Sequence, residues 1–568
     1  MAFQKSVDLS LERYLAPFQA RRLAFYRFDV LVVGSGVAGS TAALAAANAG
    51  SSVAVVSKDD LQETNTYYAQ GGVAAVLTEV DSFEAHVADT LRVGCGLSDL
   101  DAVERVVRGG PEAIKDIMTL GAEFDRTPEG ELDLSREGGH SQHRIVHALG
   151  AATGIEIQRT HDEALKAHPE ITTFENTFAI DLLSADDGRV IGVLCQTERG
   201  ELVAFSAAQV ILSTGGGGQI YRETTNPSIA TCDGVAMAFR AGAQIRDLEF
   251  FQFHPTCLYI AGAARVLISE IVRGAGGVLI DRDGTRFMPE YHESAELAPR
   301  DVVSRACFDR MVKTGDTNVY LDLSKLAKDP HALFPGISRI CKHFEIDIAR
   351  DPIPVRPGAH YMVGGIRVDT ESRTSVPGLL AVGECSSTGL HGANRMGSNS
   401  LLEGLVLGRV AGEQAAAEAR GLDLIPLSAS LRTERAGPED EVRVSIQDMT
   451  YSLKSLMWRQ LGIVRNGPSI AEAIDRIAFW TRAVLKLARP EPKAWELCNM
   501  LTIARLMGES ALSREESRGT HFRSDFPGPV AESQAHTLLV PRFEGQTITG
   551  VEISRLPVNA PLPTPART

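Results

Sequence analysis

The stretch from residue 28 to residue 58, FDVLVVGSGVAGSTAALAAANAGSSVAVVSK, constrains this chain more than any other. A short apolar run leads into Gly34, Gly36 and Gly39, and an alanine-rich helical pattern and a second β-type run follow. This order of strand, glycine turn, helix and strand places a pyrophosphate at the N-terminus of the helix. Gly34 allows the turn, Gly36 lets the backbone approach the phosphates, and Gly39 lets helix and strand pack closely. We predict a dinucleotide-binding unit; the alternative is an ordinary βαβ turn without a ligand.

The residues after the second β-type run bear on which dinucleotide is bound. The acid expected at this strand end is replaced by Ser57 and Lys58, with Asp59 and Asp60 just beyond. This departure disfavours a nicotinamide dinucleotide, because that acid would bond the adenosine ribose, and it leaves flavin adenine dinucleotide (FAD) open. A later apolar run ends in four glycines, VILSTGGGG (210–218), as expected of a domain that wraps a long cofactor. The alternative there is a plain glycine loop.

The composition disfavours several classes of protein. With 57 basic and 72 acidic residues the formal charge is −15, so a broad nucleic-acid surface is not expected. The eight cysteines include no C-x-x-C pair, which favours a reducing, cytoplasmic compartment. His140, His143 and His147 lack a completing ligand at useful spacing, so no metal site is expected. No apolar stretch has the length of a signal peptide or membrane span.

Changes in residue pattern along the chain predict an α/β fold with several domains. β-type runs and glycine loops cover residues 28–239 and return at 356–420, which predicts a Rossmann-like FAD-binding domain split by an inserted α+β capping domain, 240–355. Apolar stripes predict a C-terminal three-helix bundle within 421–568, followed by a proline-rich tail, residues 524–568, that wraps the surface. Residues 1–27 are expected to form a surface extension with helical character.

Several longer motifs resemble one flavoprotein superfamily. The segments 58–76, 213–218 and 378–405, together with the glycine turn, resemble the succinate dehydrogenase/fumarate reductase flavoproteins and, among them, the L-aspartate oxidase family, over roughly residues 28–527. The resemblance implies FAD-dependent oxidation of L-aspartate to iminoaspartate by hydride transfer to flavin. Oxygen, giving hydrogen peroxide, or fumarate would reoxidise the flavin. It also implies the first step of NAD biosynthesis, with quinolinate synthase as the partner that takes the product.

The resemblance also implies how the cofactor is held. In the respiratory members a histidine bonds covalently to FAD, and the equivalent position here is Asn65, so the FAD is expected to be non-covalent. The expected cofactor-binding residues are Gly34, Ser35, Gly36, Val37, Ala38, Gly39, Lys58, Asn65, Thr66, Tyr67, Tyr68, Ala69, Gln70, Gly71, Gly72, Asp233, Glu384, Ser400 and Leu401.

The substrate site that the resemblance implies suits a dicarboxylate. Arginine is the natural bidentate partner of a carboxylate, and Arg300 in ELAPRD and Arg395 in HGANR are the expected pair. Arg300 matches the family's proton-transfer arginine and is the expected catalytic residue, either as a transient base or as a charge stabiliser. The other expected substrate-binding residues are Glu137, Gln252, His254, Ser269 and His360.

Glu137, in SREGGHS, is the residue that distinguishes aspartate from succinate. The L-aspartate oxidases carry this motif, whereas the dicarboxylate enzymes differ at the glutamate. A carboxylate here can accept a hydrogen bond from the substrate's ammonium group, which succinate lacks. The alternative is a solvated loop residue. Two rival functions stay open: a fumarate reductase or succinate dehydrogenase flavoprotein subunit, and a non-catalytic flavin-binding protein.

Overall fold

A seven-stranded sheet forms the core of the molecule. The structure is a computed structural model that describes residues 3–150, 152–260, 266–428, 431, 433, 445–487 and 491–563. The strand order is β7-β3-β2-β10-β9-β8, and β17 also pairs with β10. The pairs among β2, β3, β7, β10 and β17 are parallel, whereas β8 and β9 pair antiparallel. The strands are β2 (Ala24–Val33), β3 (Val53–Val56), β7 (Ile171–Phe174), β8 (Phe178–Ser184), β9 (Val190–Gln196), β10 (Leu202–Leu212) and β17 (Leu379–Ala381).

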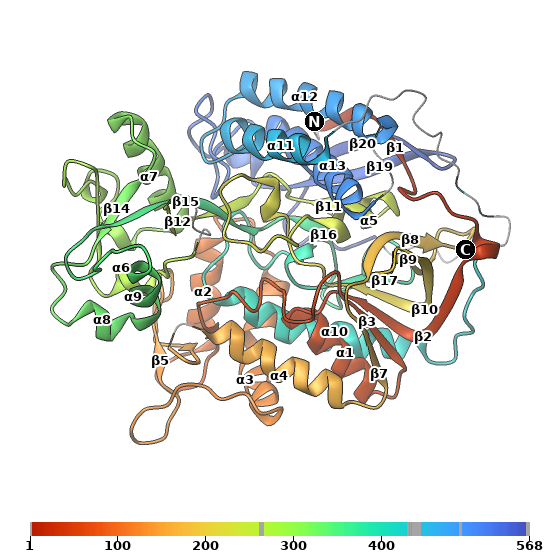
Figure 1. The fold of residues 1–568 in the computed structure, drawn as a ribbon, viewed down its shortest axis with the longest axis horizontal. Helices are drawn as coiled ribbons and strands as arrows, with labels where there is room; N and C mark the ends of the chain where they lie inside the picture. Colours follow the sequence, from red (N-terminus) through yellow and green to blue (C-terminus); the bar gives the residue numbers. More distant parts are fainter. Residues whose placement is uncertain are drawn as a thin grey trace.

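Two helices of small residues pack tightly against each other beside this sheet (Figure 1). They are α1 (Val37–Asn48) and α10 (Asn399–Ala419), from opposite ends of the nucleotide-binding sequence. Gly404, Gly408 and Gly412 recur every four residues on α10. A Cβ at Gly412 would lie 2.2 Å from the Ala42 carbonyl oxygen, so only glycine permits this approach. The packing carries the start of α10 to the glycine turn that begins α1.

Further helices and a small sheet complete the nucleotide-binding unit. The helices are α2 (Phe83–Val93), α3 (Leu100–Thr119), α4 (Thr153–Ala167) and α5 (Asp233–Arg240). Helix α3 packs on α10, and α4 packs on α1. The small sheet has the order β4-β6-β5, with strands β4 (Val73–Ala74), β5 (Leu134–Ser135) and β6 (Ile145–Val146). The loop that joins β5 to β6 carries the SREGGHSQHR sequence, so this sheet sets where Glu137 lies.

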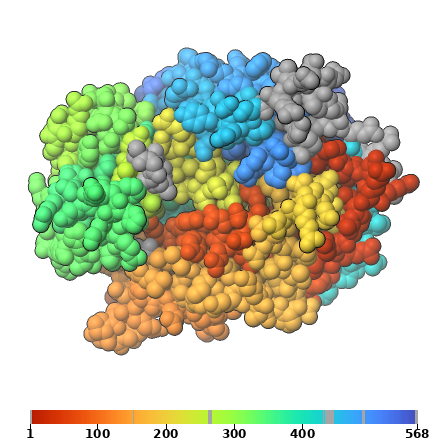
Figure 2. Space-filling view, in the orientation of Figure 1, coloured from red at the N-terminus to blue at the C-terminus, as the bar shows by residue number. Residues whose placement is uncertain are grey.

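A separate lobe with its own apolar core projects at one end of the molecule, coloured green in Figures 1 and 2. Its sheet has the order β12-β15-β14-β13. Helix α7 (Arg300–Thr314) packs on β12 and β15. The other elements are β12 (Phe251–Leu258), α6 (Ile271–Gly274), β13 (Val278–Ile280), β14 (Val319–Asp322), α8 (Pro330–Leu333), α9 (Pro335–Lys342) and β15 (Ile353–Met362).

The α/β class and the three C-terminal helices predicted from the sequence are confirmed. The helices are α11 (Ile446–Gln460), α12 (Gly467–Leu487) and α13 (Pro492–Ser513). Two expectations about the chain ends are wrong. Residues 1–27 contain a strand, β1 (Gln4–Glu12), and only a short 3-10 turn, and the tail contains β19 (His536–Glu544) and β20 (Thr547–Leu556). No helix in the described ranges is long and apolar enough to cross a membrane.

These terminal strands belong to a six-stranded sheet of order β1-β20-β19-β11-β16-β18. The short inner strands are β11 (Ile245–Arg246), β16 (Gly365–Arg367) and β18 (Ser386–Ser387). Each chain end therefore finds its strand partners hundreds of residues away. β1 is paired antiparallel with β20, with Lys5 opposite Ile553. β19 is paired with β11, close to the cofactor-binding sequence.

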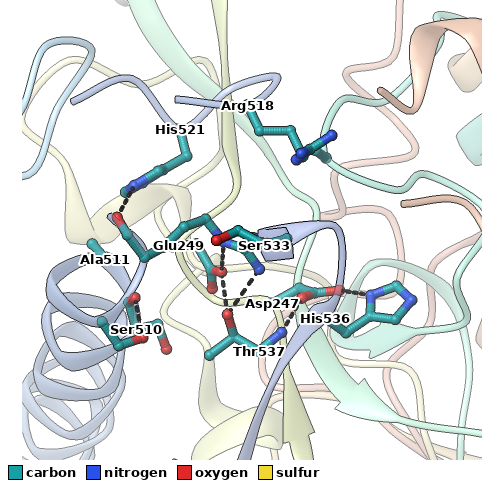
Figure 3. A network of polar contacts seen from close by, with 12 residues as sticks. Asp247, Glu249, Ser510, Ala511, Arg518, His521, Ser533, His536 and Thr537 are labelled. Carbon is teal, nitrogen blue, oxygen red and sulfur yellow. Dashed lines mark hydrogen bonds and ion pairs between the residues drawn. The ribbon is translucent and has the colours of Figure 1, made fainter. Parts of the chain in front are cut away.

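A buried polar network joins the β19 strand to the body of the molecule (Figure 3). His536 shares a hydrogen bond with Asp247 at 2.6 Å and lies 3.3 Å from Asp99. The backbone nitrogen of Thr537 donates to the other Asp247 oxygen at 2.9 Å. The Thr537 hydroxyl donates to Glu249. The C-terminal hairpin is thus fastened by charges and hydrogen bonds as well as by its strand ladder.

Candidate active site

A cavity of about 600 Å³ runs from the glycine turn to the lobe carried by β12 and β15. Its size is that of a ligand pocket. Most of the residues expected to bind the cofactor line it. They are Gly34, Ser35, Gly36, Val37, Ala38, Lys58, Asn65, Thr66, Tyr68, Ala69, Gln70, Gly71, Gly72, Asp233, Glu384, Ser400 and Leu401. The wall also contains Glu137, His254, Ser269, Arg300, His360 and Arg395. Residues that lie far apart in the sequence, from Gly34 to Leu401, therefore meet in one space.

Three of the expected residues do not line the cavity but contact residues that do. Gly39 packs α1 against the turn, because a Cβ there would lie 2.1 Å from the Gly34 carbonyl oxygen. Tyr67 places its ring 5.3 Å from the ring of Tyr68. Gln252 is fully buried, donates to the Arg395 carbonyl oxygen at 2.7 Å and accepts from Arg300 at 3.3 Å.

The glycine turn closes the N-terminal end of α1 against the ends of β2 and β10. Gly34 has φ +112°, and a Cβ there would lie 2.3 Å from the Ser213 carbonyl oxygen. The Val37 nitrogen, in the first turn of α1, bonds to the Thr66 hydroxyl at 3.0 Å. A helix N-terminus with close backbone access on a cavity wall suits a phosphate group. This end of the cavity is therefore suited to a pyrophosphate.

At the side of the turn, Lys58 lies in a cluster of buried charges. Its ammonium bonds to Asp233 at 2.8 Å and to Glu496 at 3.0 Å. Burial by itself lowers the pKa of Lys58, but the two carboxylates more than offset this, so the pKa of Lys58 is raised. Lys58 therefore stays charged and is held by two carboxylates while it lines the cavity.

The middle of the cavity presents polar atoms that no protein group satisfies. Asn65 donates to Glu384 at 2.9 Å, yet its own Oδ1 has no partner, and Asn226 Oδ1 is also buried without one. Burial raises the pKa of Glu384 to about 7. Buried polar atoms are normally hydrogen-bonded, so these await a ligand. A flavin ring and its ribityl chain, with several donors and acceptors, fit this set.

At the far end, two arginines and two histidines face the cavity. Antiparallel pairing of β12 with β15 sets the rings of His254 and His360 side by side, with centroids 5.4 Å apart. Arg395 lies over the Tyr361 ring at 4.8 Å, and its Nε and Nη1 are buried without partners. His254 Nε2 also lacks one. These unpaired donors are suited to an anionic ligand.

Burial and like charges shape the protonation of this end. Burial lowers the pKa of His254 well below its usual value, and Arg300 and His360 add to the effect. The pKa of His360 is lowered in the same way, by burial and then by Arg395. Burial and the neighbouring Arg300 lower the pKa of Arg395 to about 10. The histidines are thus neutral donors beside two charged arginines.

Glu137 is buried, which contradicts the alternative of a solvated loop residue. It accepts a hydrogen bond from the Ser398 hydroxyl at 2.7 Å. A Cβ at Gly397 would lie 3.0 Å from Glu137 and 3.1 Å from Arg300, so the two side chains converge on one point. Ser398 adopts a left-handed φ of +61° at the start of α10, a conformation that costs energy and clusters at functional sites.

Sequence reasoning missed Glu270, the carboxylate that holds Arg300. Glu270 is buried and bonds to Arg300 Nε at 2.8 Å, and it lies 3.7 Å from Arg273. Burial opposes its ionisation, but Arg300 and Arg273 outweigh this and lower the pKa of Glu270. Its acidic type next to Ser269 in SEIVRGAGG is the only local signal. The described residues hold no group of three or more His, Cys, Asp or Glu that could bind a metal ion.

Fold and cavity together define the class of protein. The FAD binding domain family matches residues 29–401, and the fumarate reductase flavoprotein C-terminal family matches residues 450–565. The Escherichia coli quinol fumarate reductase FrdA chain superposes with a TM-score of 0.87 at 32% identity, covering 96% of this chain and 99% of that chain. The protein is therefore a flavoprotein of the succinate dehydrogenase and fumarate reductase type.

Relatives of higher sequence identity show to which family within this class the chain belongs. The L-aspartate oxidase of Streptomyces coelicolor is 44% identical over 513 residues, covering 88% of each chain. L-aspartate oxidase 1 of Ralstonia nicotianae is 45% identical over 522 residues, covering 88% of this chain and 96% of that protein. This chain belongs to the L-aspartate oxidase family.

Proposed function

We propose that this protein is an FAD-dependent enzyme that oxidises L-aspartate to iminoaspartate in the first step of NAD biosynthesis. One observation carries the choice of substrate: a buried carboxylate, Glu137, faces the same space as Arg300 at the cationic end of the cavity. Aspartate carries two carboxylates and one ammonium group. Arg300 and Arg395 suit the two carboxylates. Glu137, which is bonded to Ser398 whereas Glu270 is bonded to Arg300, suits the ammonium group, and succinate would leave Glu137 buried without a cationic partner.

We assign the two arginines and His254 to the substrate carboxylates. The unpaired Nε and Nη1 of Arg395 offer a two-pronged donor. The Thr256 nitrogen donates to His254 Nδ1 at 3.3 Å, so the neutral ring carries its proton on Nε2, the atom that lacks a partner. Ser269 and His360 complete this wall. Gln252 sets the two arginines by bonding to both.

Oxidation removes a hydride from the substrate's α-carbon and one proton from its nitrogen. FAD, when bound, supplies the hydride acceptor. Glu137 accepts a hydrogen bond from the ammonium group and orients the α-carbon. We assign the catalytic role to Arg300, whose Nε donates to Glu270. It takes part in the proton transfer either as a transient base, after giving up its own proton, or as a charge stabiliser. Fixed charge and orientation provide most of the acceleration.

We further propose that FAD is bound without a covalent link. Asn65 stands at the position where the respiratory members have the bonding histidine, and its side chain is engaged with Glu384. We also propose oxygen or fumarate as electron acceptor, quinolinate synthase as the consumer of iminoaspartate, and a cytoplasmic site of action. The division into FAD-binding segments 28–239 and 356–420, a capping domain 240–355 and a C-terminal domain 421–568 is proposed on the same footing.

The test is an anaerobic half-reaction of the purified yellow protein. L-aspartate should rapidly bleach the visible flavin absorbance. An equal concentration of succinate should leave that absorbance largely unchanged. Bleaching by succinate alone would assign the chain to dicarboxylate chemistry instead. Trichloroacetic acid precipitation adds a check on the link: the yellow colour should stay in the supernatant, and colour in the pellet would contradict non-covalent binding.

A further inference from the structure

A continuous path of buried polar contacts leads from the cavity wall to the N-terminal segment. Asp233, on the wall, accepts from the Asn499 amide at 2.7 Å, and Asn499 accepts from Arg240 at 2.7 Å. Arg240 then bonds to Asp181 through two nitrogens, at 2.8 and 3.0 Å. Asp181 accepts from the Leu15 backbone nitrogen at 2.7 Å. Elements from four parts of the sequence are thus joined by the polar groups of buried residues.

Asn499 is the central residue of this path because its amide both donates and accepts. It lies on α13, which packs against α5, the helix that begins at Asp233 (Figure 1). Asn499 is fully buried. An apolar side chain in its place would leave one oxygen of Asp233 and one nitrogen of Arg240 without a partner, and buried polar groups left unpaired are costly.

Helix α13 also binds Lys58, the other charged group on this part of the cavity wall. The second Asp233 oxygen accepts from Lys58 at 2.8 Å and from the Thr231 hydroxyl at 2.8 Å. Lys58 in turn bonds to Glu496, one turn before Asn499 on α13, at 3.0 Å. Helix α13 therefore holds Asp233 through Asn499 and holds Lys58 through Glu496, although neither α13 residue lines the cavity.

We propose that α13 is part of the cofactor site, with Asn499 and Glu496 as positioning residues, and that FAD binding is coupled through Asn499, Arg240 and Asp181 to docking of residues 13–16. A ligand that orders Asp233 stabilises every contact that depends on its position, and this coupling is reciprocal. The inference rests on the proposed FAD site and is independent of the identity of the substrate. It also gives the N-terminal segment a role.

The first experiment measures FAD affinity of the apoprotein by quenching of flavin fluorescence. Asn499→Leu should weaken FAD binding about tenfold to a hundredfold, because two buried polar groups lose their partner. The matched control is Thr502→Val: Thr502 is buried on the same helix, but its hydroxyl bonds to the Cys498 carbonyl oxygen of that helix. The control should bind FAD within about twofold of wild type. Equal affinity of Asn499→Leu and wild type would overturn the proposal, as would an equal loss in the control.

A milder variant keeps the proposal open to test if Asn499→Leu does not fold. Glu496→Gln keeps a hydrogen-bond acceptor for Lys58 and removes only the charge, so FAD binding should weaken about threefold to tenfold. Unchanged affinity would contradict the role of α13. At saturating FAD the KM for aspartate should match wild type in both variants. Wild-type protein that binds no FAD would refute the proposed cofactor itself, which is a separate outcome.

The second experiment tests the long-range coupling by hydrogen exchange with mass spectrometry on the full chain. Adding FAD should slow exchange in a peptide that contains residues 13–18, because the Leu15 nitrogen bonds to Asp181. In Asn499→Leu, at FAD concentrations that saturate the variant, that protection should be lost while protection of the glycine turn persists. Exchange at residues 13–18 that does not respond to FAD in wild type would overturn the coupling.

Discussion

Two buried arginines in this molecule have opposite hydrogen-bonding environments. Arg514, beside the network of Figure 3, bonds to Glu249 at 2.7 Å and Glu516 at 2.8 Å, and its other donors reach Ser533, Ala535 and Thr537. Arg395, in the cavity, has two nitrogens without partners. The pKa values differ accordingly. Burial disfavours the charge of both, but Glu249 and its neighbours raise the pKa of Arg514, whereas Arg300 helps lower that of Arg395 to about 10.

The difference shows how this fold divides its buried charge between stability and binding. Where every donor has a protein partner, the charge belongs to the architecture. Where donors converge on a cavity and are left unpaired, the protein carries a cost that a ligand repays. The unpaired donor atoms of Arg395 and His254 are therefore more direct evidence for an anionic ligand than the sequence motifs that contain these two residues.

The sharpest test of this comparison removes one arginine from each region. Arg514→Leu leaves Glu249 and Glu516 buried without their cation, so the free energy of unfolding should fall by about 3–5 kcal/mol. Arg395→Leu should leave it within about 1 kcal/mol of wild type, because few protein contacts are lost. Urea unfolding of the apoproteins measures both. Equal destabilisation by the two changes would contradict the division into architecture and binding.

The next largest effect is expected at Arg300, which is held by Glu270 and Gln252 and faces the cavity. Arg300→Leu should lower kcat by about 10²–10³-fold, the usual cost of removing one preorganised charge from a reacting centre. The purified variant should remain yellow. Stopped-flow bleaching with aspartate checks the first point and the absorbance spectrum the second. Turnover close to wild type would exclude a catalytic role for Arg300.

Glu137→Gln tests whether Glu137, which unlike Glu270 is bonded to Ser398 and not to Arg300, recognises the amino group. Glu137→Gln keeps the shape and removes the charge, so kcat/KM for aspartate should fall about 10- to 100-fold, the worth of a hydrogen bond to a charged group. Fumarate reduction, which involves no ammonium group, should change less than about threefold. Steady-state kinetics with both substrates make the comparison. Parallel losses would show that Glu137 only shapes the pocket.

The smallest effect is a pH dependence that separates the two regions. Burial alone would lower the pKa of His536, but Asp247 and Asp99 outweigh it and raise that pKa. Its charge therefore stabilises the fold below about pH 6.5, its unfolded pKa, and this stability is lost as the pH rises through the raised folded pKa. The gap in unfolding free energy between wild type and His536→Gln should shrink from pH 6 to pH 9. A constant gap would contradict a charged His536.

In the cavity the histidine pKa values shift in the opposite direction. The pKa values of His254 and His360 are lowered, so both rings stay neutral in the folded protein across this range. The profile of kcat/KM for aspartate between pH 6 and pH 9 should accordingly show no step from either ring. A step that disappears in His254→Asn would show that the ring is charged there.

Local features allowed the sequence by itself to determine the nucleotide-binding unit. The turn at Gly34 needs a positive φ, and the flanking apolar periods distinguish strand from helix, so both can be read without knowing the neighbours. Long motifs likewise identified most of the cavity wall, including Glu137, Arg300 and Arg395. Roles stated for these residues stay predictions until the variants above are measured.

Only the tertiary structure decided which residues hold the groups of the site in place and which secondary structure the chain ends form. Glu270 and Asn499 owe their importance to Arg300 and Asp233, whose positions relative to them depend on how separate elements pack. β1 is a strand because β20 offers it a ladder, and that partner lies more than 500 residues away in the sequence. Hydrogen bonds and ion pairs between distant segments leave no periodic trace in either segment, so only the fold reveals them.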